Sequence, residues 1–247
     1  GSHKAYVYIR GEYLKSIATL QGAIDEAYQK NYLGKGIMGT SFDIDVVIHQ
    51  GAGAYICGEE TALLESLEGK KGFPRLKPPF PAVVGLFGCP TVINNVETMA
   101  CVPPIIVKGA EWFAKLGCDK NGGNRLFCVS GHVNKPGVYE LPNGTTLREI
   151  IYEHAGGILK GRNLKAVIPG GISAPLLTPD QLDVKMDFDS LKAIGSMAGS
   201  GGIIVMDDTT DMVWAAMVAA RFFAHESCGQ CSPCREGSGW VYRNIKR

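Results

Sequence analysis

The sequence has almost no net charge, because its 25 lysine and arginine residues are balanced by 24 aspartate and glutamate residues. Without a basic stripe, the chain lacks the electrostatic footprint of a nucleic-acid-binding protein. It also lacks an apolar run of the roughly 18–20 residues that span a bilayer. The longest candidate, from Met212 to Phe223, is short and is interrupted by Arg221. These absences argue against nucleic-acid binding and against a direct membrane span.

No secretory signal peptide is visible. The eight cysteines are therefore expected to be reduced thiols or metal ligands rather than a disulfide scaffold, in the cytoplasm or another reducing compartment. Glycine is in excess, with 32 of 247 residues. That excess indicates tight turns and places where the backbone comes close to a ligand.

The first third of the chain is typical of a parallel β–α–β unit. Residues 4–9 are β-branched and aromatic, and residues 12–32 carry apolar side chains at helical spacing. Residues 42–48 alternate like a second strand, and residues 59–67 should form a helix. The segment 70–81 is too rich in proline and glycine for regular structure.

The middle of the chain predicts a small β-grasp module that begins near Asn121. Thr146 and Glu149 fit a capping box, so a helix should start there and run to Ala155. From about Thr209 the chain should turn helical. Short strands are expected over 126–129, 137–141, 164–168 and 202–206.

Three cysteines near the end of the chain, Cys228, Cys231 and Cys234, recur at every third position. This spacing is used to hold three irons of a [4Fe–4S] cluster, with the fourth cysteine elsewhere. Zinc usually takes paired knuckles, or cysteine with histidine, and no second knuckle is present. The pattern favours an iron–sulfur cluster, with zinc and a redox thiol loop as alternatives. His225 is the one histidine close to this segment.

The other cysteines lie in mostly apolar contexts and are interpreted as core or incidental thiols. They are Cys57, Cys89, Cys101, Cys118 and Cys128.

A glycine-rich loop over 51–58 lies between an expected strand and an expected helix. It is not a dinucleotide fingerprint, because the third glycine position is Ile56. It is not a phosphate-binding P-loop either, because the lysine position is Glu59. Two interpretations remain. One is a negatively capped helix after a tight turn, and the other is a glycine-lined shelf for a flat ligand.

Two further motifs also allow a plain and a functional interpretation. In the proline-rich loop 73–81, Lys77 and Phe80 could offer a charge to a phosphate and a face to a base. The alternative is a solvated basic loop. Asn94 and Asn95 compete with backbone hydrogen bonds and favour a turn followed by a helix cap.

Five stretches taken together closely resemble one family, the 51 kDa (or F) flavoprotein of respiratory NADH:quinone oxidoreductase, complex I. Their order and separations agree with that family, so the resemblance covers essentially the whole chain. The stretches are 53–63, 74–82, 93–98, 167–171 and 226–237.

The resemblance implies a multidomain α/β protein. A Rossmann-like domain holding FMN and NADH would occupy 1–120, and a soluble-ligand-binding β-grasp domain with a connecting strand would occupy 121–207. The start of a helical iron–sulfur bundle would occupy 208–247. Carried over by motif, the residues lining the flavin would be Tyr55, Gly58, Glu59, Glu60, Asn94, Asn95 and Thr98.

By the same resemblance, Lys77 and Phe80 would contact NADH, with Phe80 stacking on the adenine, and the three clustered cysteines would bind a [4Fe–4S] cluster. The implied activity is hydride transfer from NADH to FMN, then one-electron transfer to the cluster and onward to quinone. No side chain needs to act as nucleophile or general acid. Flavoprotein subunits of NAD(P)-linked hydrogenases or formate dehydrogenases, and a non-catalytic docking or electron-wiring fragment, remain alternatives.

The implied partners are the thioredoxin-like [2Fe–2S] subunit and the large iron–sulfur subunit of the peripheral arm. The implied location is the cytoplasmic face of the inner membrane, or the matrix side in a mitochondrion. Family members carry a flavin-phosphate loop upstream and a fourth cluster cysteine downstream, so the chain resembles an internal piece. We therefore expect the 247 residues alone to hold FMN weakly, to bind iron poorly and to be inactive.

Overall fold

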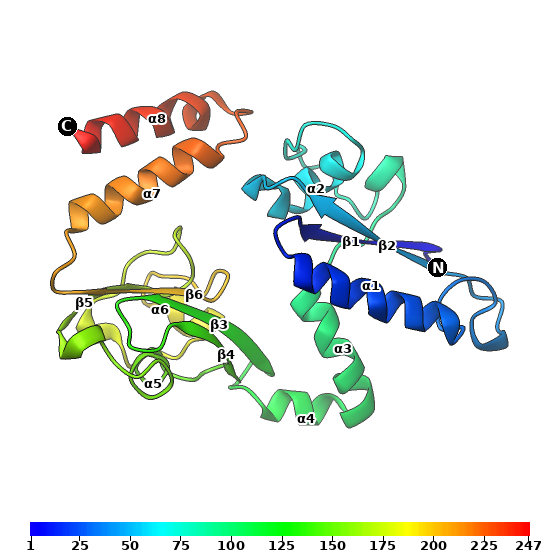
Figure 1. Ribbon diagram of the computed structural model, residues 1–247, viewed down its shortest axis with the longest axis horizontal. Helices are drawn as coiled ribbons and strands as arrows, with labels where there is room; N and C mark the ends of the chain where they lie inside the picture. Colours follow the sequence, from blue (N-terminus) through cyan, green and yellow to red (C-terminus); the bar gives the residue numbers. More distant parts are fainter. The chain divides into compact units, whose positions relative to one another are not determined.

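The computed structural model describes residues 1–247 and divides into two compact units (Figure 1). The first unit combines Gly1–Ile93 with Ala220–Arg247, and the second is Asn94–Ala219. No helix has both the length and the apolar character needed to cross a membrane.

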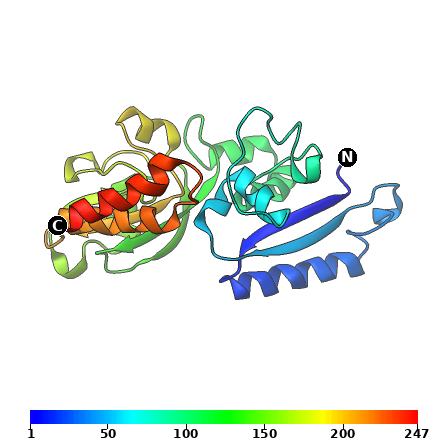
Figure 2. The same cartoon turned by 90° about the horizontal axis from the view of Figure 1, so that it is seen from above.

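The first unit opens with the predicted β–α–β arrangement, which is confirmed. Strand β1 (Lys4–Arg10) pairs in parallel with β2 (Asp45–Gly51), and helix α1 (Leu14–Gln29) connects them. Helix α1 runs along one side of the strand pair in both ribbon views (Figure 2). Strand β2 begins three residues later than predicted, because Ile44 instead exchanges backbone hydrogen bonds with Gly34 and closes the connecting loop.

After β2 the chain forms a short 3₁₀ turn, η2 (Tyr55–Gly58), and helix α2 (Glu60–Leu67). The segment from Lys70 to Pro81 is irregular, as predicted. One guanidinium orders it: Arg75 Nη2 donates to Glu68 Oε1 (2.7 Å), and Arg75 Nη1 donates to the Gly85 carbonyl (2.9 Å). A further ion pair joins Arg75 Nε to Glu65 Oε1 at 2.5 Å.

Two helices follow the second unit's sheet in the chain. Helix α7 (Met212–Glu226) begins in the second unit and ends in the first, and α8 (Ser232–Lys246) belongs to the first. The triple-cysteine segment connects these two helices.

The second unit carries a four-stranded sheet with the order β4-β3-β6-β5. Strands β3 and β6 are parallel neighbours, and the other two pairings are antiparallel. The strand predicted over 202–206 therefore lies in the middle of the sheet. The strands are β3 (Asn124–Gly131), β4 (Gly137–Pro142), β5 (Leu164–Ile168) and β6 (Gly202–Asp207).

Three helices of this unit begin at side-chain caps, which are Asn95, Thr146 and Asp187. The capping box at Thr146 is confirmed, and Asn95 caps α3, whose interior contains Pro103 and Pro104. The helices are α3 (Val96–Lys108), α4 (Ala110–Lys115), α5 (Leu147–Glu149), its π-helical continuation η4 (Ile150–His154) and α6 (Phe188–Ala193). Short 3₁₀ turns across both units lie at η1 (Ile37–Gly39), η3 (Leu86–Gly88), η5 (Leu159–Gly161) and η6 (Pro179–Gln181).

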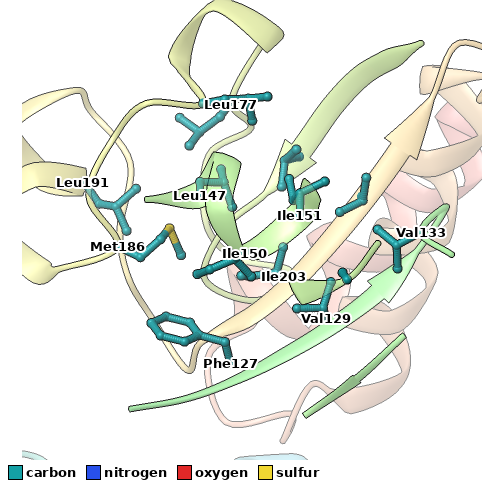
Figure 3. Packing of buried hydrophobic residues seen from close by; sticks show 14 of the residues in the cluster. Phe127, Val129, Val133, Leu147, Ile150, Ile151, Leu177, Met186, Leu191 and Ile203 are labelled. Carbon is teal, nitrogen blue, oxygen red and sulfur yellow. The ribbon is translucent and has the colours of Figure 1, made fainter. Parts of the chain in front are cut away.

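The hydrophobic core of the second unit lies between the sheet and the segments that cover it. Figure 3 shows Ile150 and Ile151 of the π-helical turn packed with Phe127 and Val129 of β3 and Ile203 of β6. These side chains are 0–3% exposed. The removal of these apolar side chains from water stabilises the sheet.

Candidate functional site

The glycine-rich loop leaves β2 and presents an exposed aromatic side chain. Gly53 has a φ of +91°, which favours glycine over any residue with a Cβ. Tyr55 is 60% exposed. A Cβ added at Gly58 would meet no atom within 4 Å, so the surface above this position is open. This geometry fits a flat ligand resting on the loop, as the shelf interpretation requires.

Glu59 is the N-cap of α2, which confirms the predicted negatively capped helix. Its Oε2 accepts hydrogen bonds from the backbone N–H groups of Thr61 and Ala62, both at 2.9 Å, and from the Thr61 hydroxyl at 2.6 Å. Burial opposes ionisation, but these hydrogen bonds and one from Lys77 prevail and lower the pKa of Glu59. The carboxylate is therefore ionised at neutral pH, and its negative charge stabilises the N-terminus of α2.

Lys77 and the two adjacent glutamates are brought together from different loops. Lys77 Nζ donates to Glu60 Oε1 and, at 3.3 Å, to Glu59 Oε1. The hydrogen bond to Glu60 is the main cause that raises the pKa of Lys77. Phe80, on the same loop, is 57% exposed. The proline-rich loop thus places its cation directly beside the acidic start of α2.

Asn94, Asn95 and Thr98 lie in the second unit, at the start of α3. The Asn95 side chain accepts a hydrogen bond from the backbone N–H of Glu97 at 2.8 Å, so the turn-and-cap interpretation is confirmed. All three residues are exposed.

The cysteine segment carries free thiols. Cys228 is half-buried, whereas Cys231 and Cys234 are exposed. No three histidine, cysteine or acidic side chains converge on a position where they could hold a metal ion. A [4Fe–4S] cluster differs from a single ion, because each thiolate binds a different iron. Three soft thiolate donors on one short segment fit such a cluster chemically.

The structure adds three residues that sequence reasoning missed. Glu226 Oε2 accepts the backbone N–H of Tyr55 (3.2 Å), and the Phe222 ring meets the Tyr55 ring edge-on, with centroids 5.3 Å apart. Gln230 Nε2 donates to the Pro74 carbonyl (3.0 Å). Glu226 and Gln230 stand within the 226–237 stretch, so their place beside the cysteines was the available signal. His225, by contrast, is exposed.

Three family models match the chain in succession. They are the Nuo51 FMN-binding domain over residues 1–104, the SLBB domain over 125–205, and the NADH-ubiquinone oxidoreductase-F iron-sulfur binding region over 214–247. These matches and the α/β fold make the chain similar to flavoprotein subunits that carry an iron–sulfur region.

Similar proteins agree with this class. The F-2 subunit of NADH-quinone oxidoreductase from Rhizobium meliloti (strain 1021) is 60% identical over 247 residues. The F subunit of NADH-quinone oxidoreductase from Rickettsia typhi (strain ATCC VR-144 / Wilmington) is 56% identical over 248 residues. Each match covers 100% of the chain but 59% of the relative. The chain is similar to these NADH-quinone oxidoreductase subunits and spans about three fifths of their length.

Two solved structures are also similar to the chain. NAD⁺-reducing [NiFe]-hydrogenase in the air-oxidized state matches with a TM-score of 0.85 and 39% sequence identity, and its H₂-reduced state matches with a TM-score of 0.86. Both matches cover 100% of this chain and 40% of the hydrogenase chain.

Proposed function

We propose that this chain is the cofactor-binding part of a NADH dehydrogenase flavoprotein, in which electrons pass from NADH through FMN and a [4Fe–4S] cluster toward quinone. One observation carries the proposal. Within a single unit, the end of α7 contacts the glycine-rich loop, the cysteine segment contacts the proline-rich loop, and that loop contacts the start of α2 directly after the glycine-rich loop. The family models for an FMN-binding domain and an iron–sulfur region match these same segments.

In this proposal, the open surface at Gly58 and the exposed Tyr55 ring receive the flavin. When bound, FMN supplies the redox chemistry, because it accepts two electrons from NADH and releases them one at a time. The protein binds the flavin and orients it. The flavin-lining set is Tyr55, Gly58, Glu59, Glu60, Asn94, Asn95 and Thr98.

Lys77 and Phe80 are proposed to hold NADH. A lysine ammonium is a strong partner for a phosphate, and an exposed phenylalanine offers a face to the adenine. Lys77 is already neutralised by Glu59 and Glu60. A bound pyrophosphate would therefore share the ammonium with these carboxylates, which limits how tightly the nucleotide is held.

Cys228, Cys231 and Cys234 are proposed to hold the [4Fe–4S] cluster, with the fourth ligand outside this segment. We further propose a division into a flavin and NADH domain over 1–120, a β-grasp domain over 121–207 and a cluster domain over 208–247. Its partners would be the [2Fe–2S] and large iron–sulfur subunits of a peripheral arm. That arm would lie on the cytoplasmic face of the membrane.

The proposal is tested on the complete flavoprotein purified with its partner subunits. We expect stoichiometric FMN, NADH oxidation with ferricyanide as acceptor, and a four-iron EPR signal after reduction. Lys77→Ala should raise the KM for NADH, whereas Lys71→Ala should not. Lys71 is the matched control, since it is a lysine of the same segment that lies over the Phe73 ring. Purification without flavin would contradict the proposal and favour a docking fragment.

The match to an NAD⁺-reducing hydrogenase makes a hydrogenase flavoprotein the second candidate. Both candidates would oxidise NADH, so the physiological acceptor separates them. Membranes containing the complete complex should reduce a quinone analogue with NADH. Evolution of H₂ from NADH without quinone reduction would favour the hydrogenase.

A further inference from the structure

Two polar side chains join the cysteine segment to the loops on which the proposed cofactor site depends. Glu226 stands two residues before Cys228, and Gln230 stands between Cys228 and Cys231. Neither is a thiol or a charge that the proposed electron path needs. Both nevertheless make their hydrogen bonds to backbone atoms of distant loops.

Glu226 acts on the glycine-rich loop. Its carboxylate accepts the Tyr55 N–H, while Phe222, one helical turn earlier on α7, meets the Tyr55 ring at an interplanar angle of 75°. Residues four apart lie on the same face of a helix. One face of α7 therefore holds both the backbone and the ring of Tyr55. A bond to a charged acceptor is also about twice as strong as a neutral one.

Gln230 contacts the proline-rich loop where other hydrogen bonds also restrain it. It donates to the Pro74 carbonyl, and the next backbone N–H, that of Arg75, donates to the Thr61 hydroxyl (2.8 Å). The Arg75 side chain is in turn held by Glu65 and Glu68. Gln230 thus connects the cysteine segment to a part of the loop that is fixed to α2, three residues before Lys77.

We propose that Glu226 and Gln230 are positioning residues that hold the cysteine segment against both loops, so that ordering of the loops by a bound nucleotide also orders the cysteine segment. The coupling through Gln230 rests on the proposed nucleotide site. The restraint of Tyr55 by Glu226 does not. Two ligand-binding segments joined by direct hydrogen bonds share their ordering free energy, which is the physical basis of such coupling.

The first test is hydrogen exchange in the complete flavoprotein with its partners. Exchange of the peptide containing Tyr55 should become about 10-fold faster in Glu226→Leu, because a charge-assisted hydrogen bond is lost. Glu226→Gln keeps a carbonyl acceptor and should restore slow exchange. If Glu226→Leu does not fold, Glu226→Asp replaces it, since it withdraws the acceptor by one methylene. Unchanged exchange in the variants without the acceptor would overturn the Glu226 role.

The second test uses ADP-ribose, a nucleotide that cannot donate a hydride. In the wild type it should slow exchange in both 73–81 and 227–235. Gln230→Met keeps the length of the side chain and removes the donor. In this variant ADP-ribose should no longer slow exchange in 227–235. The slowing of exchange in 73–81 should stay within about 2–10-fold of the wild-type value, the range expected for the loss of one neutral hydrogen bond. Glu236→Gln, an exposed site on α8, is the control and should behave like the wild type.

The outcomes separate the two proposals. Protection of 227–235 that persists in Gln230→Met would overturn the coupling. If ADP-ribose protected neither segment of the wild type, both the coupling and the proposed nucleotide site would be wrong. The Glu226 result would still stand or fall on the exchange of Tyr55.

Discussion

Each of the two units of the chain is stabilised by a different kind of interaction. In the second unit, the core between the sheet and its helices is apolar and inaccessible to water: Phe127, Leu147, Ile150 and Ile151 are all 0% exposed. In the first unit, few large side chains are buried, and Leu64 of α2 is the most enclosed of them at 1% exposed. Its loops are ordered instead by the Glu59 cap and the Arg75 ion pairs.

This difference indicates which parts of the chain can rearrange their contacts when a ligand binds. Apolar burial stabilises the sheet without depending on polar partners. Loops held by polar contacts remain exposed and can exchange partners with a ligand. The proposed cofactor residues Tyr55, Lys77 and Phe80 of the first unit lie on such exposed loops.

The largest expected effect tests the sealed core. Ile150→Ala should lower the free energy of unfolding of the second unit by about 2–5 kcal/mol, since it leaves a cavity in a packed interior. Val138→Ala, at a side chain 63% exposed on β4, should change it by about 0.5 kcal/mol or less. Urea unfolding of each variant measures both. Equal losses would show that the core contributes no more than the surface.

The next effect tests the ion pairs that Arg75 makes with Glu65 and Glu68 in the first unit. Arg75→Met should destabilise this unit by about 2–3 kcal/mol, because Glu65 loses its partner and Glu68, only 8% exposed, keeps only Lys70 of its two charged partners. Arg148→Met breaks an exposed pair with Asp183 in the second unit and should cost about 1 kcal/mol or less. The contrast is read from hydrogen exchange within each unit. Similar costs would refute the view that the loops depend on Arg75.

The same ion pairs also predict a pH dependence. Hydrogen bonds from Lys70 and Arg75 lower the pKa of Glu68 from 4.5 to about 2. The ionised carboxylate therefore stabilises the fold fully above pH 4.5, and this contribution declines as the pH falls toward 2. Glu68→Gln should flatten that part of the stability–pH profile. Asp207 in the second unit also has a pKa of about 2, chiefly through its hydrogen bond from Thr209. The second unit should therefore lose stability in the same pH range. Glu68→Gln should leave that unit's stability–pH profile unchanged, because Glu68 lies in the first unit.

How much of this fold follows from sequence depends on the range of the interactions. The cap at Thr146 and the first β–α–β unit are local patterns, and both were predicted correctly. Helix α3 was not predicted beyond its Asn95 cap, because Pro103 and Pro104 normally end a helix. The central position of β6 depends on its pairing with the distant strand β3, which no local pattern specifies.

The same limit applies to the site. The motifs that contain Lys77 and Glu60 are visible in the sequence, but their ion pair is not. Glu226 and Tyr55 are 171 positions apart, and their contact depends on how the end of α7 meets the glycine-rich loop. Residue types therefore indicated the candidate ligands, whereas the side chains that position them required the structure.

A smaller effect is expected where the loops meet a ligand. Lys77→Ala and Phe80→Ala should each weaken NADH binding by about 1–3 kcal/mol, the scale of a charged hydrogen bond or a stacking contact. Thermal stability should change little, because Phe80 is exposed and Lys77 pairs with carboxylates near the surface. The KM for NADH and the melting temperature are measured together. Early melting with an unchanged KM would assign both residues to the fold.

The smallest expected effect concerns charge alone. Glu60→Gln keeps an acceptor for Lys77 but removes one negative charge from the proposed flavin site. A nearby anion disfavours the reduced, anionic flavin, so its removal should raise the flavin potential by an amount equivalent to about 1 kcal/mol or less in this exposed setting. Glu12→Gln removes the same charge from an exposed pair with Arg10 and serves as the control. Spectroelectrochemical titration of the complete flavoprotein compares the two. An equal response, or none, would place Glu60 away from the flavin and leave it only as the partner of Lys77.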